Sequence, residues 1–149
     1  PVQRCLVHIQ RMCKIWLSAY PKSVAGFELR EIVCKLHFVD SEVKKQYWIK
    51  EFLDWFEKHK DFLNEKSYSL ETGRYWYTHK MVRRCFSVIR KALPNMFTFL
   101  QNHKIPKTTN GIESFFGHLK GNLNIHRGLT KSRRKKFIQW YLFYKNLKS

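Results

Sequence analysis

A single carboxylate, Glu113, is the most distinctive chemical group in the second half of the chain. It lies in the segment 108–114 (TTNGIES) and is the only acidic residue after Glu71, whereas residues 72–149 carry seventeen lysines and arginines. A region this basic is where a polyanion would bind. A carboxylate there repels phosphate unless a cation stands between them, and a divalent metal ion is the usual mediator. The pattern therefore indicates metal-assisted chemistry on a nucleic acid.

The spacing around Glu113 predicts an exposed helical strip that could hold a phosphate backbone. Gly117 and Lys120 follow at i+4 and i+7, which share one helix face with Glu113. The strip would offer a carboxylate, a gap without a side chain, and an ammonium group to bind a phosphate. The apolar stripe lies to one side and comprises Ile112, Phe115, Phe116, Leu119 and Leu123. The spacing fits equally a capping glutamate on a surface helix with an unrelated lysine.

A dense basic cluster opens the last predicted helix. Cations at a helix amino terminus oppose the helix dipole, so helix stability does not explain them, whereas phosphate binding does. His126 and Arg127 in the preceding turn could reach the same phosphate backbone. The alternative is a face that serves only solubility. The cluster comprises Lys131, Arg133, Arg134, Lys135 and Lys136.

Aromatic residues form a second pattern. Tyr75, Trp76 and Tyr77 stand beside Arg74 and could stack on an unpaired base, or could instead pack in a helical core. The other tryptophans lie on apolar faces of predicted helices, and we expect them in the core: Trp16, Trp48, Trp55 and Trp140.

Two cysteine–histidine pairs share one spacing, Cys5-x-x-His8 and Cys34-x-x-His37. Two such pairs could form a Cys2His2 zinc site. Both lie in apolar periodic stretches, where cysteine is usually a buried thiol. We therefore do not expect zinc, and we expect reduced cysteines.

Charge and length limit the classes of protein to which this chain can belong. The 149 residues carry a net charge of +18, and 44% of them are hydrophobic, which excludes a disordered basic tail. Twelve basic and ten acidic residues nearly balance in residues 1–71, so the surplus lies in the remainder. This charge favours nucleic acid as a partner, with an anionic membrane surface second. No apolar run approaches the roughly 20 residues of a membrane span, and the start at Pro1 suggests part of a longer or processed chain.

The periodicity predicts a mainly α chain. We expect a short strand over residues 2–7, an irregular segment over 64–78, and an extended connector over 103–107. Thr109 or Asn110 could cap the helix of Glu113, and Asn110 with Glu113 resembles a capping box. Helices are expected over 6–20, 23–38, 41–63, 78–92, 94–100, 110–123 and 130–147.

Two motifs together resemble DDE transposases, most closely the Mutator-type group of bacterial insertion sequences. The segment 108–114, Lys120 and the segment 125–129 (IHRGL) resemble the carboxy-terminal catalytic segment of that family. There an Asn-x-x-Glu opens the helix with the third catalytic acid, which Asn110 and Glu113 match. A basic residue follows seven positions later, as Lys120 does.

The amino-terminal end is similar to the same family. Cys5 and His8 match the Cys-x-x-His that follows the second catalytic aspartate. A related transposase group has an arginine four residues before the glutamate, where this chain has Thr109, so no role is transferred to Thr109.

The resemblance implies a particular fold and division of the chain. The chain would comprise the helical insertion and the carboxy-terminal helices of a ribonuclease H-like transposase catalytic domain. Residues 1–20 would end the catalytic core with a strand and a helix, 21–105 would form the helical insertion, and 106–149 would hold the third-acid helix and the basic last helix. The first two catalytic acids would lie outside this chain.

The resemblance also implies a function. Glu113 would be one ligand of two Mg²⁺ or Mn²⁺ ions in the full enzyme, and the chain alone would be inactive. Its partners would be the DNA of transposon ends and target, during strand cleavage and transfer, with no membrane. The full-length protein would be a homo-oligomer in the cytoplasm at the nucleoid. The alternatives are a non-enzymatic helical DNA-binding module and a basic amphipathic protein on anionic membranes.

Overall fold

The computed structural model describes residues 2–102 and 104–147, and most of them are helical. The mainly α class expected from the periodicity is therefore confirmed. The chain divides into two compact units, Pro1–Thr108 and Thr109–Ser149, and each is described by itself. The expected division after residue 20 assigns segments to parts of a larger enzyme, and it stays a prediction. Within this chain the first helix belongs to the same unit as the helices that follow it.

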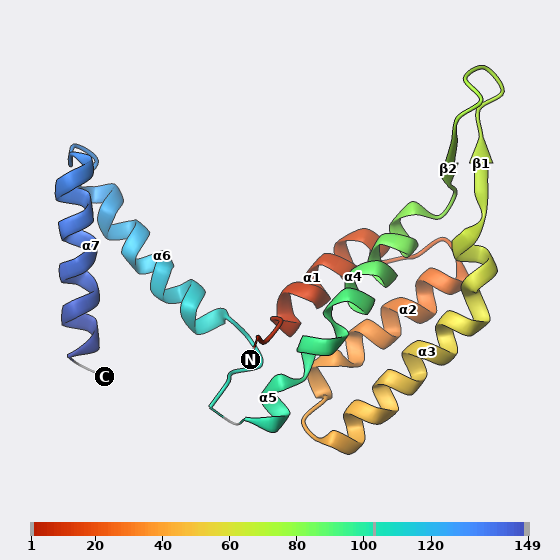
Figure 1. The fold of residues 1–149 in the computed structure, drawn as a ribbon, viewed down its shortest axis with the longest axis horizontal. Coiled ribbons are helices and arrows are strands. Elements are labelled where there is room, and N and C mark those ends of the chain that lie inside the picture. The colour runs from red at the N-terminus through yellow and green to blue at the C-terminus, as the bar shows by residue number, and fades with distance from the viewer. Residues whose placement is uncertain (1, 103, 148–149) are drawn as a thin grey trace. The chain divides into compact units, whose positions relative to one another are not determined.

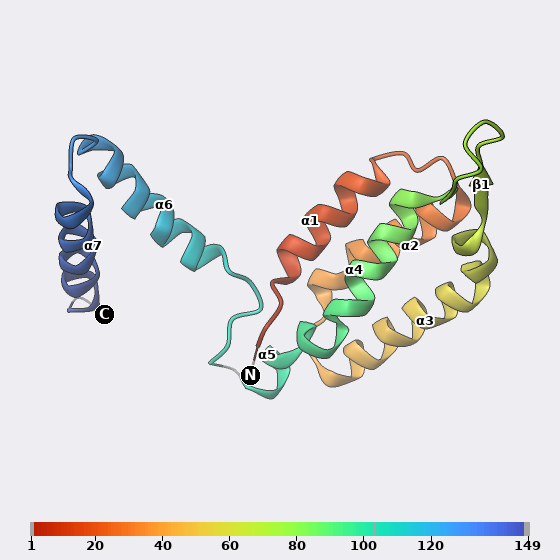
Figure 2. The same cartoon turned by 45° about the horizontal axis from the view of Figure 1, so that its top comes forward.

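Unit 1 is a bundle of helices from which a β-hairpin projects (Figures 1 and 2). The first four α-helices run side by side, and the hairpin follows α3 directly. Strands β1 and β2 are antiparallel, with Ser67 opposite Trp76. The elements of unit 1 are α1 (Leu6–Leu17), α2 (Val24–Lys35), the 3-10 turn η1 (Leu36–Phe38), α3 (Glu42–Asn64), β1 (Lys66–Tyr68), β2 (Tyr75–Tyr77), α4 (Lys80–Met96) and α5 (Thr98–Gln101).

The core of unit 1 is built on the aromatic face of α3. Phe52 is fully buried, and Trp48 stacks on it with ring centroids 5.6 Å apart. The indole Nε1 of Trp48 donates to the carbonyl oxygen of Ile32 at 2.8 Å, and that of Trp55 donates to Ala25 at 3.0 Å. Both acceptors lie on α2. A buried indole N–H needs a partner, so these two bonds fix α3 against α2 while the rings fill the core.

Two buried cysteines face each other across α1 and α4. Cys13 and Cys85 are both fully buried. Burial, and then the hydrogen bond with Cys13, raises the pKa of the Cys85 thiol far above its usual range. Cys5 and Cys34 are only half-buried, and no disulfide joins any of these cysteines in the described part of the chain.

The strand expected over residues 2–7 is wrong, because this segment bonds to a helix end instead of to another strand. The backbone N–H of Arg4 donates to the carbonyl of Asn95 at 2.7 Å. The side-chain oxygen of Gln3 accepts from the N–H of Phe99 at 2.9 Å. The polar groups that a sheet would have paired are thus used at the α4–α5 junction.

The segment 64–78, expected to be irregular, contains the hairpin. Its turn has Gly73 at φ +63°, a conformation that glycine adopts without strain. The ammonium of Lys66 lies 4.3 Å from the ring centroid of Tyr75 on the paired strand. The cation–π contact and the cross-strand pairing stabilise a sequence whose turn signal is weak.

Helix α4 continues past the end expected at residue 92. Pro94 lies inside its last turn, and the helix ends two residues later at Met96. Proline removes one N–H from the helix ladder. The missing bond falls in the last turn of α4, and the helix ends at Met96. Of the connector expected over 103–107, His103 lies outside the described residues, and residues 104–107 have no regular structure.

Unit 2 is a helical hairpin of α6 (Asn110–Ile125) and α7 (Lys131–Asn146). Only Leu119 and Leu123 are buried among its described residues. The hydroxyl of Thr130 caps α7 by accepting from the N–H of Arg133 at 3.4 Å. Trp140, expected in the core, is 57% exposed. The reason is that unit 2 has only two helices, so most of the apolar surface of α7 finds no partner within the hairpin.

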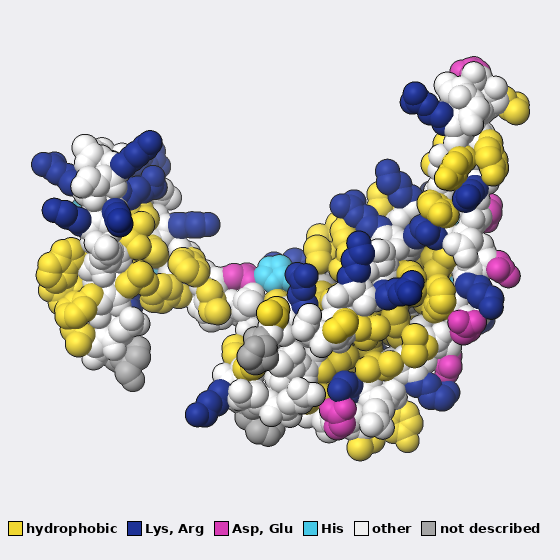
Figure 3. Space-filling view, viewed as in Figure 1, with side chains coloured by type: hydrophobic (Ala, Val, Ile, Leu, Met, Phe, Trp, Pro, Cys, Tyr) yellow, Lys and Arg dark blue, Asp and Glu magenta, His cyan; other side chains and the backbone are white. Residues whose placement is uncertain are grey.

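Charges are distributed unevenly over unit 1 (Figure 3). The acidic side chains gather along α3, and most of them hold a lysine. Hydrogen bonds from Lys58 and then from His59 lower the pKa of Glu28 below its usual value. The lysine–carboxylate pairs are Lys35–Glu51, Lys44–Asp40, Lys45–Glu42, Lys50–Asp54, Lys58–Glu28 and Lys60–Glu57. Across the described residues, no helix is long and apolar enough to cross a membrane.

Candidate nucleic-acid interface

Glu113 lies exposed in the first turn of α6, and Thr109 holds its side chain. The hydroxyl of Thr109 donates to Oε1 of Glu113 at 2.6 Å, and the N–H of Glu113 donates back to the carbonyl of Thr109 at 2.9 Å. A carboxylate at this end of a helix is favoured by the helix dipole. The carboxylate therefore has a defined position on the surface of unit 2.

The capping box expected between Asn110 and Glu113 does not form. Thr109 precedes the helix as its cap residue, and Asn110 is the first helical residue. The threonine hydroxyl bonds the carboxylate instead of a backbone N–H. Thr109 was one of the two cap residues expected from the sequence, and it is the residue that precedes the helix. Sequence reasoning missed the contact of its hydroxyl with Glu113, because a contact four residues apart at a helix start depends on which residue leaves the helical conformation. Only the backbone geometry shows this.

An open strip of backbone runs along α6 beside Glu113. Gly117 and Lys120 are exposed, as the helical spacing requires. A Cβ added at Gly117 or at Gly121 would meet nothing within 4 Å. Glycine in a helix interior costs about 1 kcal/mol relative to alanine, and no neighbouring side chain uses the space it leaves. The strip therefore allows another molecule to approach the helix backbone closely between the carboxylate and the ammonium group.

The basic cluster at the start of α7 is exposed but does not form one surface. Lys131, Arg134 and Lys135 are spaced i, i+3 and i+4, and they share one side of the helix. Arg133 and Lys136 lie on another side, from which the exposed aromatics of α7 also project. No ion pair with a carboxylate is found for these five in the described part of the chain. A single phosphate backbone could contact the first three together.

The turn between the helices places its two candidate residues differently. The ring of His126 lies 5.5 Å from that of Phe137 on α7, measured between centroids. The N–H of His126 donates to the carbonyl of Leu123 at 3.2 Å and ends α6. Arg127 is exposed. His126 thus closes the helical hairpin, and Arg127 is the residue of the turn that is better placed to bind phosphate.

The donor set of this chain does not fit a two-metal centre by itself. Glu113 is the only acidic residue of unit 2. The described residues contain no group of three or more His, Cys, Asp or Glu that could hold a metal ion. Two divalent cations need more than one carboxylate. The other ligands of any such centre would have to come from outside unit 2.

The cysteine–histidine pairs lie on the bundle of unit 1. Cys5 precedes α1 and His8 lies in its first turn, both half-buried. His37 lies in η1, where its Nδ1 is 3.3 Å from Nε2 of Gln10. Neither pair belongs to a metal-binding group among the described residues.

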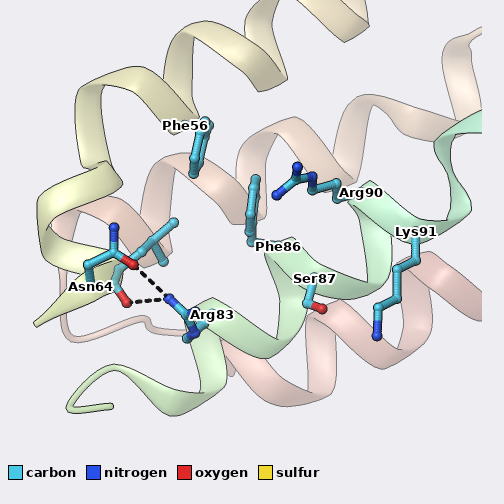
Figure 4. A pocket seen from close by; sticks show the side chains of 8 residues that line it. Phe56, Asn64, Arg83, Phe86, Ser87, Arg90 and Lys91 are labelled. Carbon is cyan, nitrogen blue, oxygen red and sulfur yellow. Dashed lines mark hydrogen bonds between the residues drawn. The ribbon is translucent and has the colours of Figure 1, made fainter. Parts of the chain in front are cut away.

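A hollow of about 430 Å³ lies between α3 and α4, and the sequence patterns did not predict it (Figure 4). Phe56 and Phe86 stack in it with ring centroids 4.5 Å apart. Arg83 is fixed at one end, where Nη1 donates to the carbonyl of Leu63 at 2.9 Å and to Oδ1 of Asn64 at 3.0 Å. Its other polar lining residues are Ser87, Arg90 and Lys91. Candidate anion-binding residues therefore occur in unit 1 as well as in unit 2.

Comparisons with known proteins identify no relative. No protein-family model matches the chain. No curated protein matches it, and no solved structure does.

Proposed function

We propose that this chain is the carboxy-terminal part of a DDE transposase of the Mutator type. In this proposal α6 supplies Glu113 as the third catalytic acid, and α7 contacts the DNA. The observation that carries the proposal is the exposed strip of α6. It joins an oriented carboxylate, a bare stretch of helix at Gly117 and an exposed Lys120.

The charge of unit 2 supports a nucleic acid as the partner. Residues 109–149 hold nine lysines and arginines against Glu113 alone. Binding of cations to phosphates releases counterions from DNA and drives association. A carboxylate held inside such a field has no electrostatic use in DNA binding, because it repels the backbone. It has a use in a shared metal site whose other acids lie outside this chain.

The position of Glu113 at the DNA can be tested by binding of the whole chain to a labelled duplex without metal. Glu113→Gln removes one negative charge and should tighten binding by about two- to threefold at low salt, which corresponds to a charge pair at about 6 Å in water. Glu31→Gln is the matched control, since Glu31 is an exposed carboxylate of unit 1. Equal effects of the two substitutions would place Glu113 away from the DNA.

The catalytic part of the proposal has its own test. The chain alone should neither cut nor join DNA in the presence of Mn²⁺, because one carboxylate cannot hold the metal ions. Metal-dependent cleavage that persists in Glu113→Gln would contradict the assignment. The coding sequence before Pro1 should contain two further aspartates, and terminal inverted repeats should flank the gene.

A non-enzymatic helical DNA-binding module is the second candidate. The observation that favours it is the absence of any metal-binding group among the described residues. This candidate makes the same DNA-binding predictions as the transposase proposal, but it predicts a different genomic setting. Flanking DNA without inverted repeats, and no upstream aspartates, would select it over the transposase.

A further inference from the structure

A groove in unit 1 lies between β2 and α4, separate from the basic cluster of α7. Its volume is about 700 Å³, within the range of ligand-binding clefts. One wall is the aromatic strand β2, and the other is one side of α4. The lining residues are Tyr75, Trp76, Tyr77, Lys80, Arg83, Arg84, Ser87, Val88 and Lys91.

The α4 wall is a row of three cations and one serine in helical register. Lys80, Arg84, Ser87 and Lys91 are spaced i, i+4, i+7 and i+11, which places them on one helix face. At 1.5 Å per residue the row is about 16 Å long. Helix α4 contains no acidic residue. The row therefore presents positive charge along the whole length of the groove.

These cations differ from the lysines of α2 and α3, which are paired with carboxylates. Six lysines, from Lys35 to Lys60, hold carboxylates within 3.1 Å. Lys80, Arg84 and Lys91 are exposed, and no ion pair joins any of them to a carboxylate in the described part of the chain. Figure 3 shows basic side chains over α4, opposite the acidic edge at α3. The uncompensated charge marks α4 as the anion-binding side of unit 1.

The aromatic wall is arranged for stacking. Arg83 lies 3.6 Å from the ring centroid of Tyr77, and its hydrogen bonds to the end of α3 fix it there. Tyr75 is held under Lys66. Trp76 is 51% exposed and makes neither a ring-stacking nor a cation–π contact with the described residues. The hairpin thus presents one uncovered indole to solvent beside the cationic row.

We propose that this groove binds single-stranded nucleic acid, with phosphates on the row of α4 and a base stacked on Trp76. A cationic groove lined by aromatic side chains is the usual construction of a single-strand site. In a duplex the faces of the bases are occupied by their neighbours, so a duplex could use the cations but not the indole. The inference concerns unit 1 alone and does not depend on the role proposed for Glu113.

The test measures binding of the whole chain to a fluorescent oligothymidylate of about 12 nucleotides and to a duplex of equal phosphate count. Trp76→Ala should weaken single-strand binding at least fivefold, the lower end for loss of one stacked base. Duplex binding should change less than twofold. Trp76→Phe, which keeps an aromatic face, should restore most of the single-strand affinity. Tyr47→Ala is the matched control, because Tyr47 is 71% exposed on α3 and lies outside the groove.

The cationic row is tested by the double variant Arg84→Gln and Lys91→Gln. The control is the double variant Lys50→Gln and Lys60→Gln, which removes the same charge from α3. The first pair should weaken single-strand binding severalfold more than the second. Circular dichroism of each variant checks that unit 1 remains folded. Equal loss of single-strand and duplex affinity on Trp76→Ala would overturn the proposal. Displacement of the oligonucleotide by poly-glutamate of equal charge, with no effect of Trp76→Ala, would also overturn it, since the groove would then be a general polyanion site.

Discussion

The exposed cations at the start of α7 allow a quantitative prediction about salt. Lys131, Arg134 and Lys135 share one side of the helix, whereas Arg133 and Lys136 lie on another. One phosphate backbone can therefore contact three of the five at once. Each contact contributes about −0.9 to the slope of log affinity against log salt. Replacing Lys131, Arg134 and Lys135 together by glutamine should flatten that slope by about 2.7.

The assay is duplex binding of the whole chain, measured by anisotropy from about 50 to 200 mM salt. Three contacts correspond to a loss of affinity of about 40-fold across this range, and the triple variant should lack that component. Glutamine keeps a good helix propensity, and removing cations from a helix amino terminus relieves an unfavourable dipole interaction. The variant should therefore remain folded, which circular dichroism can verify.

Two controls separate a local phosphate contact from a general effect of net charge. Replacing Lys44, Lys50 and Lys60 by glutamine removes the same charge from lysines that already pair with carboxylates. This control should change the slope by less than about 0.5, because it leaves the interface intact. Replacing both Arg133 and Lys136 by glutamine should have at most an intermediate effect on the slope. If the lysine control and the α7 variant flatten the slope equally, the reasoning from helix faces is refuted.

Three further predictions concern α6 and the bundle. Gly117→Ala should stabilise α6 by up to about 1 kcal/mol and weaken duplex binding, as seen in paired thermal melts and binding curves, and unchanged binding would show that the strip is not approached. Hydrogen bonds from α3 lower the pKa of Glu28, so this carboxylate stabilises the fold above the usual glutamate pKa and ceases to do so as pH falls through its lowered value. Urea titrations should show Glu28→Gln less stable than wild type by under about 1 kcal/mol at pH 7, with no difference near pH 2, whereas a difference that persists there would exclude ionisation as its cause. A thiol reagent should modify Cys34 in the native protein but Cys13 and Cys85 only on unfolding, since both are fully buried, and rapid native labelling of all three would contradict the packing of α1 on α4.

The helices could be predicted because apolar residues recur along the chain with the helical period. The third helix, expected over 41–63, is α3 (Glu42–Asn64), and the side chain of Ser41 caps it by accepting from the N–H of Lys44. The strand expected at residues 2–7 failed because so short a stretch does not say which partner takes the backbone hydrogen bonds. The hairpin at 64–78 was missed for a related reason. Its pairing depends on contacts across the turn that the local sequence does not encode.

The candidate site likewise has one feature that the sequence predicts and one that it does not. Helical spacing alone is enough to place Glu113, Gly117 and Lys120 on one face, since this follows from about 3.6 residues per turn. The contact of Thr109 with Glu113 does not follow from spacing, because it depends on the residue at which the helix begins.

The sequence by itself determined the helical class and the charge asymmetry, because both depend on residue type and on local periodicity. Only the tertiary structure decided how the charges are used. It paired the lysines of α2 and α3 with carboxylates, whereas no ion pair joins the lysines of α4 or Lys131, Lys135 and Lys136 of α7 to a carboxylate among the described residues. It also buried Trp48 and Trp55 while leaving Trp76 and Trp140 exposed. The physical reason is that burial and pairing depend on which neighbours the fold brings within contact distance, and residues far apart in the chain supply those neighbours.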